Sequence, residues 1–335
     1  MTVTPKDRYF YLWSWSDLLL GIYCLMAYLL VDSFASNFWM SLSANYVQDI
    51  FCLGIIFFSL TIVNIWVAWS AWRAGDDDRL FGGTWLAVMR SEYLTRQRFW
   101  DIIHYYLLFK VVLIVYGLIK QSIPLIHGQL FDDILLKQDI FFHLGRNPML
   151  DMVHIFSGWA DGYIDLAYVG WYPVLGSMMI VLLMQRDRRV MEWGIFSLLF
   201  LWMAGGLLAL AVPSLGPVYV RSEWFAGLSV PHARMIQAQL WQHYQEIIAG
   251  AEATKFHNYE GIAAFPSLHV AIVALYSFVL WRINRISAWL MIAYTVVVQI
   301  GSVFLGWHYA IDGYIGIALA FVIAKTSERL FGVRQ

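Results

Sequence analysis

Long apolar runs alternate with short polar segments along the chain, and this pattern predicts an all-helical membrane protein. Most of the runs reach the ~20 residues that a helix needs to cross a hydrocarbon core about 30 Å thick. We expect about eight transmembrane helices, near residues 17–35, 48–72, 101–126, 163–184, 192–213, 267–281, 286–306 and 309–326. The expected fold class is therefore all-α, in the form of a polytopic integral membrane protein.

Two longer polar segments interrupt this pattern. Residues 127–162 alternate apolar and polar positions, which predicts two amphipathic helices lying at the membrane interface. Asn147 and Pro148 are expected to separate them, because the residue before a proline resists helical geometry and proline favours the first turn of a helix. The second segment, 214–265, is the most polar part of the chain and is predicted to hold a short helix near 237–248.

Composition agrees with a membrane protein and narrows the functions to consider. Hydrophobic residues make up 60% of the 335 residues and charged residues only 13%, which leaves no large soluble domain. The net charge of −1 gives no general basic field for binding nucleic acid. Cys24 and Cys52 fall inside apolar runs, so neither a structural disulfide nor a thiolate metal site is expected.

Basic residues are distributed unevenly between the two sides of the predicted bundle. Fifteen of the twenty-two Lys and Arg residues lie on the side that carries both termini, five lie on the other side, and Lys110 and Lys120 fall within the third run. Cytoplasmic loops are enriched in Lys and Arg, so both termini are expected in the cytoplasm. The segment before the sixth helix and the turn between the seventh and eighth then face the periplasm, the extracellular side or a lumen. No cleavable signal peptide is expected, because the first run starts late and no small-residue cleavage site follows it.

Two short motifs near the C-terminal end place ionisable side chains on that outer side. His269 ends the sequence Pro-Ser-Leu-His, and His308 begins the sequence His-Tyr-Ala-Ile-Asp, which ends at Asp312. The separation of the two histidines corresponds to roughly 58 Å of helix, or two membrane crossings, so both return to the same side. Asp312 shares a helix face with His308, where its carboxylate is expected to hold the imidazole ring. An imidazole ring held in one tautomer is a better nucleophile, so these residues predict a phosphoryl-transfer site. Because the site faces away from the cytoplasm, cytosolic nucleotides are not expected as its substrates.

These motifs resemble those of the type 2 phosphatidic acid phosphatase superfamily, whose second signature is usually Pro-Ser-Gly-His and whose third ends in His-x-x-x-Asp. The matching residues are Pro266, Ser267, His269, His308 and Asp312. The chain departs from the pattern at Leu268, which replaces the usual glycine, and at Ser302, which stands where the third signature has an arginine. The first signature, Lys-x6-Arg-Pro, does not occur in the sequence.

The departures are similar to the inositol phosphorylceramide synthase branch, in which Phe-Pro-Ser-Leu-His and His-Tyr-x-x-Asp are the expected forms. The chain has both, together with a proline-rich stretch at 213–219 and the pair Asp132 and Asp133. The resemblance is specific over 205–326, weaker over 125–185, and implies a six-helix-type catalytic core. We accordingly expect N-terminal transmembrane helices 1–3 with a cytoplasmic loop (1–126), an outer interfacial segment (127–162) and a catalytic transmembrane bundle (163–335).

The resemblance implies a role for each catalytic candidate. His308 is expected to attack phosphorus and form a phosphohistidine, Asp312 to orient the ring, and His269 to protonate the leaving oxygen and later deprotonate the acceptor. The expected function is that of a membrane lipid phosphotransferase, which moves a phospho-head group from a phospholipid donor to a lipid or alcohol acceptor, as in sphingolipid metabolism. No cofactor and no metal are expected, because histidine, arginine and helix amides supply the positive charge.

Phosphate ligands are expected among the outer polar residues. Ser267 is either a helix N-cap or, with the free amides of that helix start, a phosphate ligand. Arg221 follows the proline-rich turn and is the preferred cation, although a solvated loop charge explains it equally well. Tyr219 and Ser302 offer hydroxyl donors.

Carboxylates suit the hydroxyl groups of a sugar or polyol head group. Asp161 and Asp165 lie at the outer start of the fourth predicted helix and on one face of it, so they are head-group candidates. Stabilisation of the helix start by the macrodipole is the alternative explanation.

Two other functions remain open. If water reaches the phosphohistidine, the protein is a lipid phosphate or polyprenyl (di)phosphate phosphatase. A non-enzymatic lipid-binding or transport protein would instead need polar residues through the membrane midplane, whereas the runs 192–213, 286–300 and 314–324 are almost free of charge.

Overall fold

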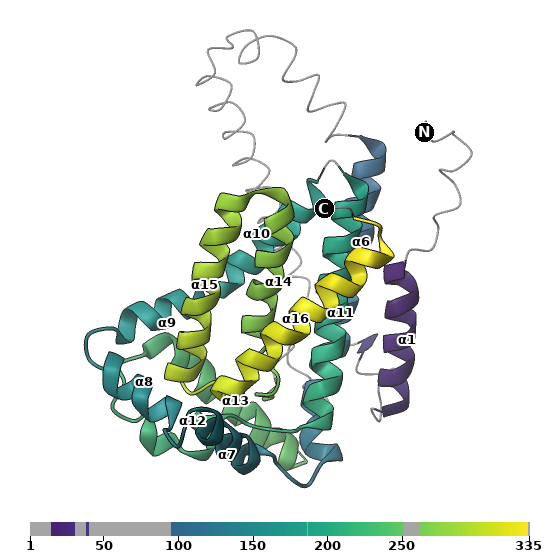
Figure 1. Cartoon of the computed structure of the whole chain (residues 1–335). Helices are drawn as coiled ribbons and strands as arrows, with labels where there is room; N and C mark the ends of the chain where they lie inside the picture. Colours follow the sequence, from purple (N-terminus) through teal and green to yellow (C-terminus); the bar gives the residue numbers. More distant parts are fainter. Residues whose placement is uncertain (1–14, 31–37, 40–94, 186, 251–260, 334–335) are drawn as a thin grey trace.

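The computed structural model describes residues 15–30, 38–39, 95–185, 187–250 and 261–333 (Figure 1). Within these residues the regular structure is helical throughout, which confirms the all-α fold class. The helix expected at 48–72 and the N-terminal residues 1–14 lie outside the described residues.

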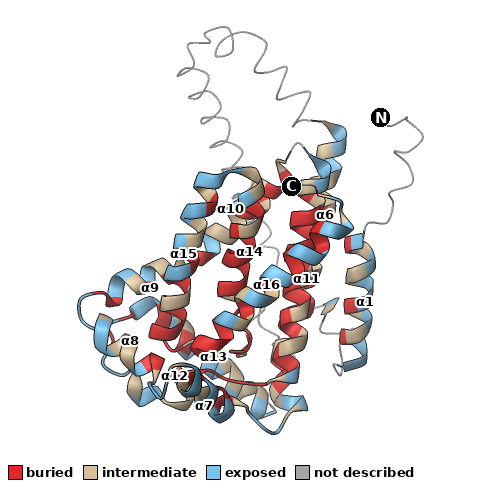
Figure 2. Cartoon of the chain, in the orientation of Figure 1, coloured by how far each residue is buried: buried red, intermediate tan, exposed pale blue. Residues whose placement is uncertain are grey.

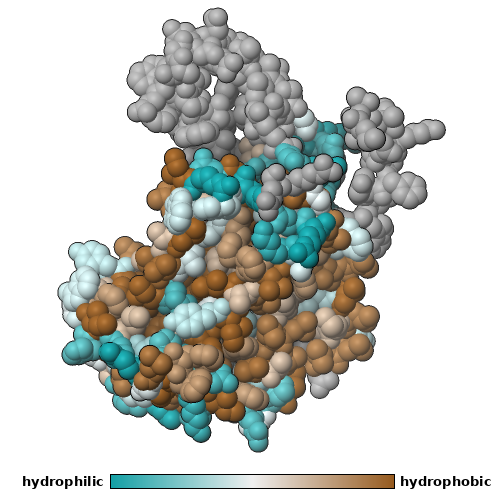
Figure 3. Space-filling model, viewed as in Figure 1, coloured by the Kyte–Doolittle hydropathy of each residue, from teal (hydrophilic) through white to brown (hydrophobic). Residues whose placement is uncertain are grey.

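Five segments of the described chain are long and apolar enough to cross a membrane. They are α6 (Arg96–Ile126), the segment Asp161–Leu183 formed by α9 (Asp161–Val169) and α10 (Trp171–Leu183), α11 (Arg188–Ala211), α15 (Arg285–Phe304) and α16 (Ala310–Leu330). Two shorter apolar helices, α1 (Trp15–Leu30) and α14 (Leu268–Ile283), accompany them. These elements correspond to seven of the eight predicted helices. Figure 3 shows hydrophobic side chains over the middle of one face and hydrophilic ones gathered toward its ends.

The fourth predicted helix is divided in two at Gly170. Pro173 has no amide hydrogen for the carbonyl of Val169, so the helical bonding pattern cannot continue unbroken here. Close to this break, Tyr294 of α15 donates to the carbonyl of Ala167, at 3.0 Å. The span predicted at 163–184 is confirmed as Asp161–Leu183, with this interruption at Gly170.

Short helices cover one end of the bundle, at the bottom of Figure 1. They are α7 (Asp132–Phe142), α8 (Pro148–Phe156), α12 (Pro217–Val220), the 3-10 helix η3 (Ser222–Trp224) and α13 (Pro231–Ile248). The predicted boundary in the 127–162 segment is confirmed, because the Asn147 side chain accepts the amide of Met149 at 3.0 Å and Pro148 begins α8. The polar helix predicted near 237–248 is longer than expected and begins at Pro231.

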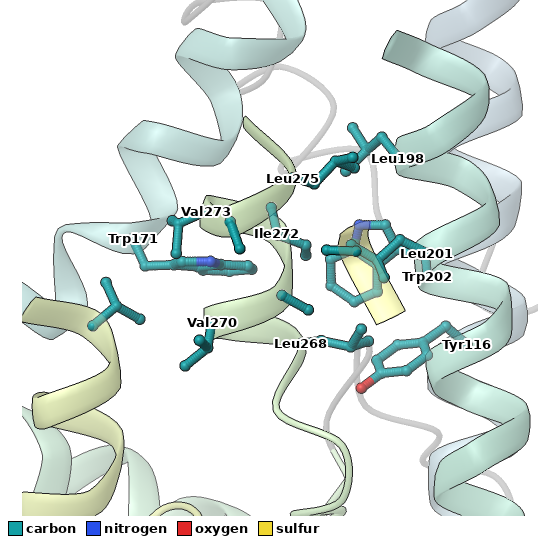
Figure 4. Close-up of a cluster of buried hydrophobic side chains, with 14 of the residues drawn as sticks. Tyr116, Trp171, Leu198, Leu201, Trp202, Leu268, Val270, Ile272, Val273 and Leu275 are labelled. Carbon is teal, nitrogen blue, oxygen red and sulfur yellow. The ribbon is translucent and has the colours of Figure 1, made fainter. Parts of the chain in front are cut away.

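The core of the bundle is centred on α14, which packs against α15, α16, α11 and α10. Buried residues concentrate on α11 and α14 (Figure 2). In Figure 4, Leu268 and Leu275 of α14 lie with Trp171 of α10 and Trp202 of α11 in one cluster of buried side chains. Burial of both its faces explains why the sequence of α14 is almost continuously apolar.

Glycines allow neighbouring helices to approach the start of α14 closely. A Cβ on Gly205 of α11 would lie 2.5 Å from Leu268 Cδ2, so the leucine side chain occupies the space that a larger residue would fill. A Cβ on Gly316 of α16 would lie 2.7 Å from the backbone oxygen of Ser267. These contacts fix the backbone at the position from which His269 projects.

Candidate active site

Three segments interlock beside the N-terminal ends of α14 and α16. The loop before α14 is joined to the loop after α11, because Ser214 accepts the amide of Ala264 with its carbonyl, at 2.9 Å, and the amide of Phe265 with its hydroxyl, at 3.0 Å. The Phe265–Pro266 peptide bond in this loop is cis. Gly216, with φ +101°, completes the junction, since a Cβ there would lie 2.5 Å from the carbonyl oxygen of Trp307.

The turn between α15 and α16 positions His308. Its amide donates to the carbonyl of Ser302 at 3.1 Å. Gly306, with φ +74°, takes a left-handed conformation in the same turn and accepts the amide of Val218 at 2.9 Å. Backbone contacts from three segments therefore fix the direction of the imidazole.

His269 and His308 come together as the sequence predicted, with their ring centroids 5.9 Å apart. The Nδ1 atom of His308 lies 2.6 Å from the carbonyl oxygen of Ala264. A carbonyl only accepts hydrogen bonds, so Nδ1 of the neutral ring carries the proton and Nε2 keeps its lone pair. Nε2 is thus the nucleophilic nitrogen in this arrangement.

Asp312 lies near the same ring but makes a less direct contact than the sequence predicted. Its Oδ2 is 3.7 Å from His308 Nδ1, beyond the shorter bond to Ala264. The same oxygen accepts the amide of Tyr309 at 2.9 Å and caps α16. Its Oδ1 has no hydrogen-bond partner among the described residues. A carboxylate at this distance would favour a positive charge that develops on the ring.

Burial sets the ionisation of His308. The side chain is almost inaccessible, and desolvation lowers the pKa of His308 to about 4, with a smaller contribution from the positive charge of Lys120. The hydrogen bond to the Ala264 carbonyl opposes this shift. At neutral pH the ring is therefore uncharged, which is the form that attacks phosphorus.

We expect kcat/KM not to fall as the pH is lowered from 7 to 5. A histidine with the ordinary pKa of 6.5 would be mostly protonated at pH 5, whereas the lowered pKa keeps His308 neutral until the pH nears 4. The measurement is kcat/KM against pH with a phosphodiester lipid, because a phosphate monoester titrates near pH 6 by itself. An acidic limb with a midpoint near 6.5 would contradict this assignment.

Lys120 is a candidate that the sequence analysis did not select. It lies near the outer end of α6 and interacts electrostatically with both His269 and His308. Its Nζ is also 5.4 Å from the centroid of the Tyr116 ring. A lysine inside an apolar span is costly and for that reason marks a functional position, which was the available signal.

The four predicted phosphate ligands differ in their surroundings. Ser267 is fully buried beside His269, and its hydroxyl has no partner among the described residues. Ser302 donates its hydroxyl to the carbonyl of Gln299 within α15, at 2.8 Å.

Arg221 and Tyr219 are engaged elsewhere. Arg221 pairs with Asp133 of α7 at 3.2 Å on the exposed surface. Tyr219 donates to the carbonyl of Gln237 at 3.3 Å and stacks on Trp241. The geometry brings neither side chain to the histidine pair.

Asp161 and Asp165 are buried and bound to backbone amides. Asp161 accepts the amides of Gly158 and Ser229, at 2.9 and 2.8 Å. Asp165 accepts the amides of His232 and Ala233, at 2.9 and 2.8 Å, and so caps α13. These bonds fasten the outer segment to α9, and a head-group role for the two carboxylates gains no support from them.

Two carboxylates of α7 hold the segments that carry the site. Asp132 accepts the amides of Leu215 and Gly216, at 3.0 and 2.9 Å, and the hydroxyl of Tyr309 at 3.0 Å. Asp139 accepts the first two amides of α16, from Ala310 at 2.7 Å and Ile311 at 2.8 Å. Burial raises the pKa of Asp139, and these two amide bonds oppose the shift.

Comparison with known proteins identifies the family. The family model described as the PAP2 superfamily matches residues 134–326, more than half of the chain. Neither a curated protein nor a solved structure gave a significant match. The matched region contains both histidines and α7 to α16 almost entirely, while Lys120 lies before it. The resemblance read from the sequence is thus confirmed at the level of the superfamily, and this chain belongs to the PAP2 superfamily.

Proposed function

We propose that the protein is a membrane lipid phosphotransferase that works through a phosphohistidine at His308. Members of the PAP2 superfamily are phosphatases or phosphotransferases. The observation that carries the proposal is the histidine pair, 5.9 Å apart, in which the proton of His308 is fixed on Nδ1 by the Ala264 carbonyl. This arrangement supplies one nucleophilic nitrogen and one acid or base for the opposite side of a phosphorus atom.

The first half of the reaction transfers the phospho-head group to the enzyme. His308 Nε2 attacks phosphorus, the bond from phosphorus to the oxygen of the donor lipid breaks, and His269 gives that oxygen a proton. The ring then carries a positive charge with its Nδ1 proton still shared with the Ala264 carbonyl. Asp312, 3.7 Å from Nδ1, stabilises this charge.

The second half reverses these roles. His269 removes the proton of an acceptor hydroxyl, the oxygen attacks phosphorus, and the bond to Nε2 breaks, which regenerates neutral His308. An acceptor lipid gives a new phospholipid, and water gives the phosphatase reaction. The almost complete burial of His308 supports an alcohol acceptor over bulk water.

Phosphate charge is balanced in this proposal by Lys120, Ser267 and the first amides of α14. Ser267 is the N-cap of α14, and its side chain does not bond the helix amides, which supports a role for these donors in binding phosphate. They replace the basic residues of the usual superfamily signatures. Arg221 is not part of this set because it pairs with Asp133.

The site is proposed to face away from the cytoplasm. In Figure 1, α7, α8 and α13 lie at the end of the bundle opposite to the C-terminal end of α16. The excess of Lys and Arg on the side of the termini supports a cytoplasmic position for them. A donor lipid of the outer leaflet then keeps its tails in the bilayer while its phosphate reaches His308.

The test uses purified protein with head-group-labelled phospholipids, including an inositol lipid, and with ceramide, diacylglycerol or polyprenol acceptors. We expect a new labelled lipid that requires both an acceptor and His308. Labelled phosphate released from lipid monophosphates or polyprenyl diphosphates without acceptor would instead identify the phosphatase. Identical traces for wild type and His308→Ala would reject both enzymatic assignments and favour a lipid-binding role.

A further inference from the structure

Two aromatic side chains lie against His269. The ring centroid of Trp171 lies 4.5 Å from that of His269, and the ring centroid of Tyr168 lies 5.3 Å from it. They come from α10 and α9, on either side of the break at Gly170.

The polar atoms of both rings lack partners. Trp171 Nε1 and Tyr168 Oη have no hydrogen-bond partner among the described residues, although the side chains are 4% and 6% exposed. Buried polar groups are nearly always hydrogen-bonded, and an indole N–H is only a donor. The pair therefore calls for a ligand that brings hydrogen-bond acceptors.

The opposite face of the same helices is accessible from outside the protein. Leu166 of α9 is 63% exposed, although it lies two residues before the buried Tyr168. Tyr172 of α10 is 58% exposed, although it directly follows the buried Trp171. Both belong to the candidate membrane span Asp161–Leu183. In a bilayer, α9 and α10 thus form the wall between His269 and the lipid.

We infer that Tyr168 and Trp171 form a subsite for the polar backbone of the lipid alcohol, and that they donate hydrogen bonds to its ester or amide carbonyl oxygens. This inference rests on the proposed function. In both halves of that reaction His269 exchanges a proton with the hydroxyl oxygen of a lipid alcohol, which is the leaving group of the donor or the acceptor. The carbon backbone that carries this oxygen therefore lies beside Tyr168 and Trp171, the neighbours of His269. Tyr and Trp side chains combine an apolar ring, which packs against acyl chains, with one O–H or N–H group, which donates to a carbonyl oxygen.

The test compares a diacyl substrate with its dialkyl ether analogue, which lacks the carbonyl acceptors. Wild type should prefer the diacyl lipid by about tenfold in kcat/KM, the equivalent of one good hydrogen bond. Tyr168→Phe keeps the ring and removes the donor, and Trp171→Phe keeps an aromatic side chain and removes the donor, so each should reduce this preference by lowering kcat/KM more for the diacyl lipid than for the ether lipid. Tyr163→Phe, on the exposed face of α9, is the matched control and should behave as wild type. Equal losses on both lipids, or no loss on either, would overturn the inference.

A binding measurement separates this inference from the proposed function. Diacylglycerol with a photoreactive group on its acyl chain should label Asp161–Leu183 in a saturable manner. Unlabelled diacylglycerol should compete about tenfold better than the dialkyl ether, and Trp171→Phe should reduce the difference. If His308 is never phosphorylated but this pattern is found, the proposed function fails and the subsite stands. Equal competition by the two lipids would reject the subsite whatever the activity.

Discussion

Replacing His308 with alanine is expected to abolish the phosphoenzyme and to lower turnover by at least about 10³-fold. The basis is that His308 Nε2 is a neutral imidazole nitrogen beside His269, and that the 2.6 Å contact of Nδ1 with the Ala264 carbonyl fixes its tautomer. Without its nucleophile the covalent route is lost altogether, whereas a general acid or base typically contributes about 10²- to 10⁴-fold. The measurement is acid-labile labelling of the protein by a labelled donor lipid, together with turnover.

His269→Ala provides the contrast for this prediction. Its loss should depend on the leaving group, because His269 is proposed to protonate the departing oxygen. A substrate with a weakly basic leaving group, such as a nitrophenyl phosphoester, needs little protonation and should still label His308, whereas a lipid donor should label it slowly. If His308→Ala retained labelling, or if both variants responded alike to the leaving group, the assignment of the two roles would be wrong.

The helices and the histidine pair were predictable because both depend on local pattern. Apolar runs specify helices in a bilayer, and Asn147 followed by Pro148 specifies the start of α8 through a side chain that reaches amides two and three residues away. The side shared by His269 and His308 followed from counting two membrane crossings. Their 5.9 Å approach is consistent with that count.

The supporting contacts were not predictable because they join distant segments through backbone atoms. The acceptor for His308 Nδ1 is the carbonyl of Ala264, and nothing in an alanine side chain marks it. Asp312 was assigned to that nitrogen from its spacing of one helical turn, but capping of α16 is its closer contact. Arg221 was favoured by its place after a turn, and only the fold shows that Asp133 is its partner.

The role of α7 is a further case of this kind. Its polar positions were expected to form the water-facing side of an interfacial helix. Instead Asp132 and Asp139, two turns apart on the same helix face, turn toward the site and accept five hydrogen bonds from the chain between 215 and 311. A spacing of seven residues between buried carboxylates was visible in the sequence, but their partners were not.

Replacing Asp139 with alanine is expected to have the second largest effect, on stability as well as activity. It leaves the amides of Ala310 and Ile311 buried without an acceptor, at a cost of about 1–3 kcal/mol for each unpaired group. The start of α16 follows His308 by two residues, so its relaxation should also displace the nucleophile. A displacement of about 1 Å is enough to cost about 10²-fold in rate.

The measurement combines thermal unfolding in detergent with the rate of His308 phosphorylation. Asp139→Asn keeps one carbonyl acceptor and should recover part of both losses, because a single amide oxygen can still receive one of the two helix donors. Asp133→Ala, on the exposed side of the same helix, is the matched control and should change neither quantity, since its ion pair with Arg221 lies in solvent. If Asp139→Ala kept full phosphorylation, α7 would serve only to cover the bundle. If Asp133→Ala were as damaging as Asp139→Ala, the exposed pair rather than the buried cap would be what holds α7 against the site.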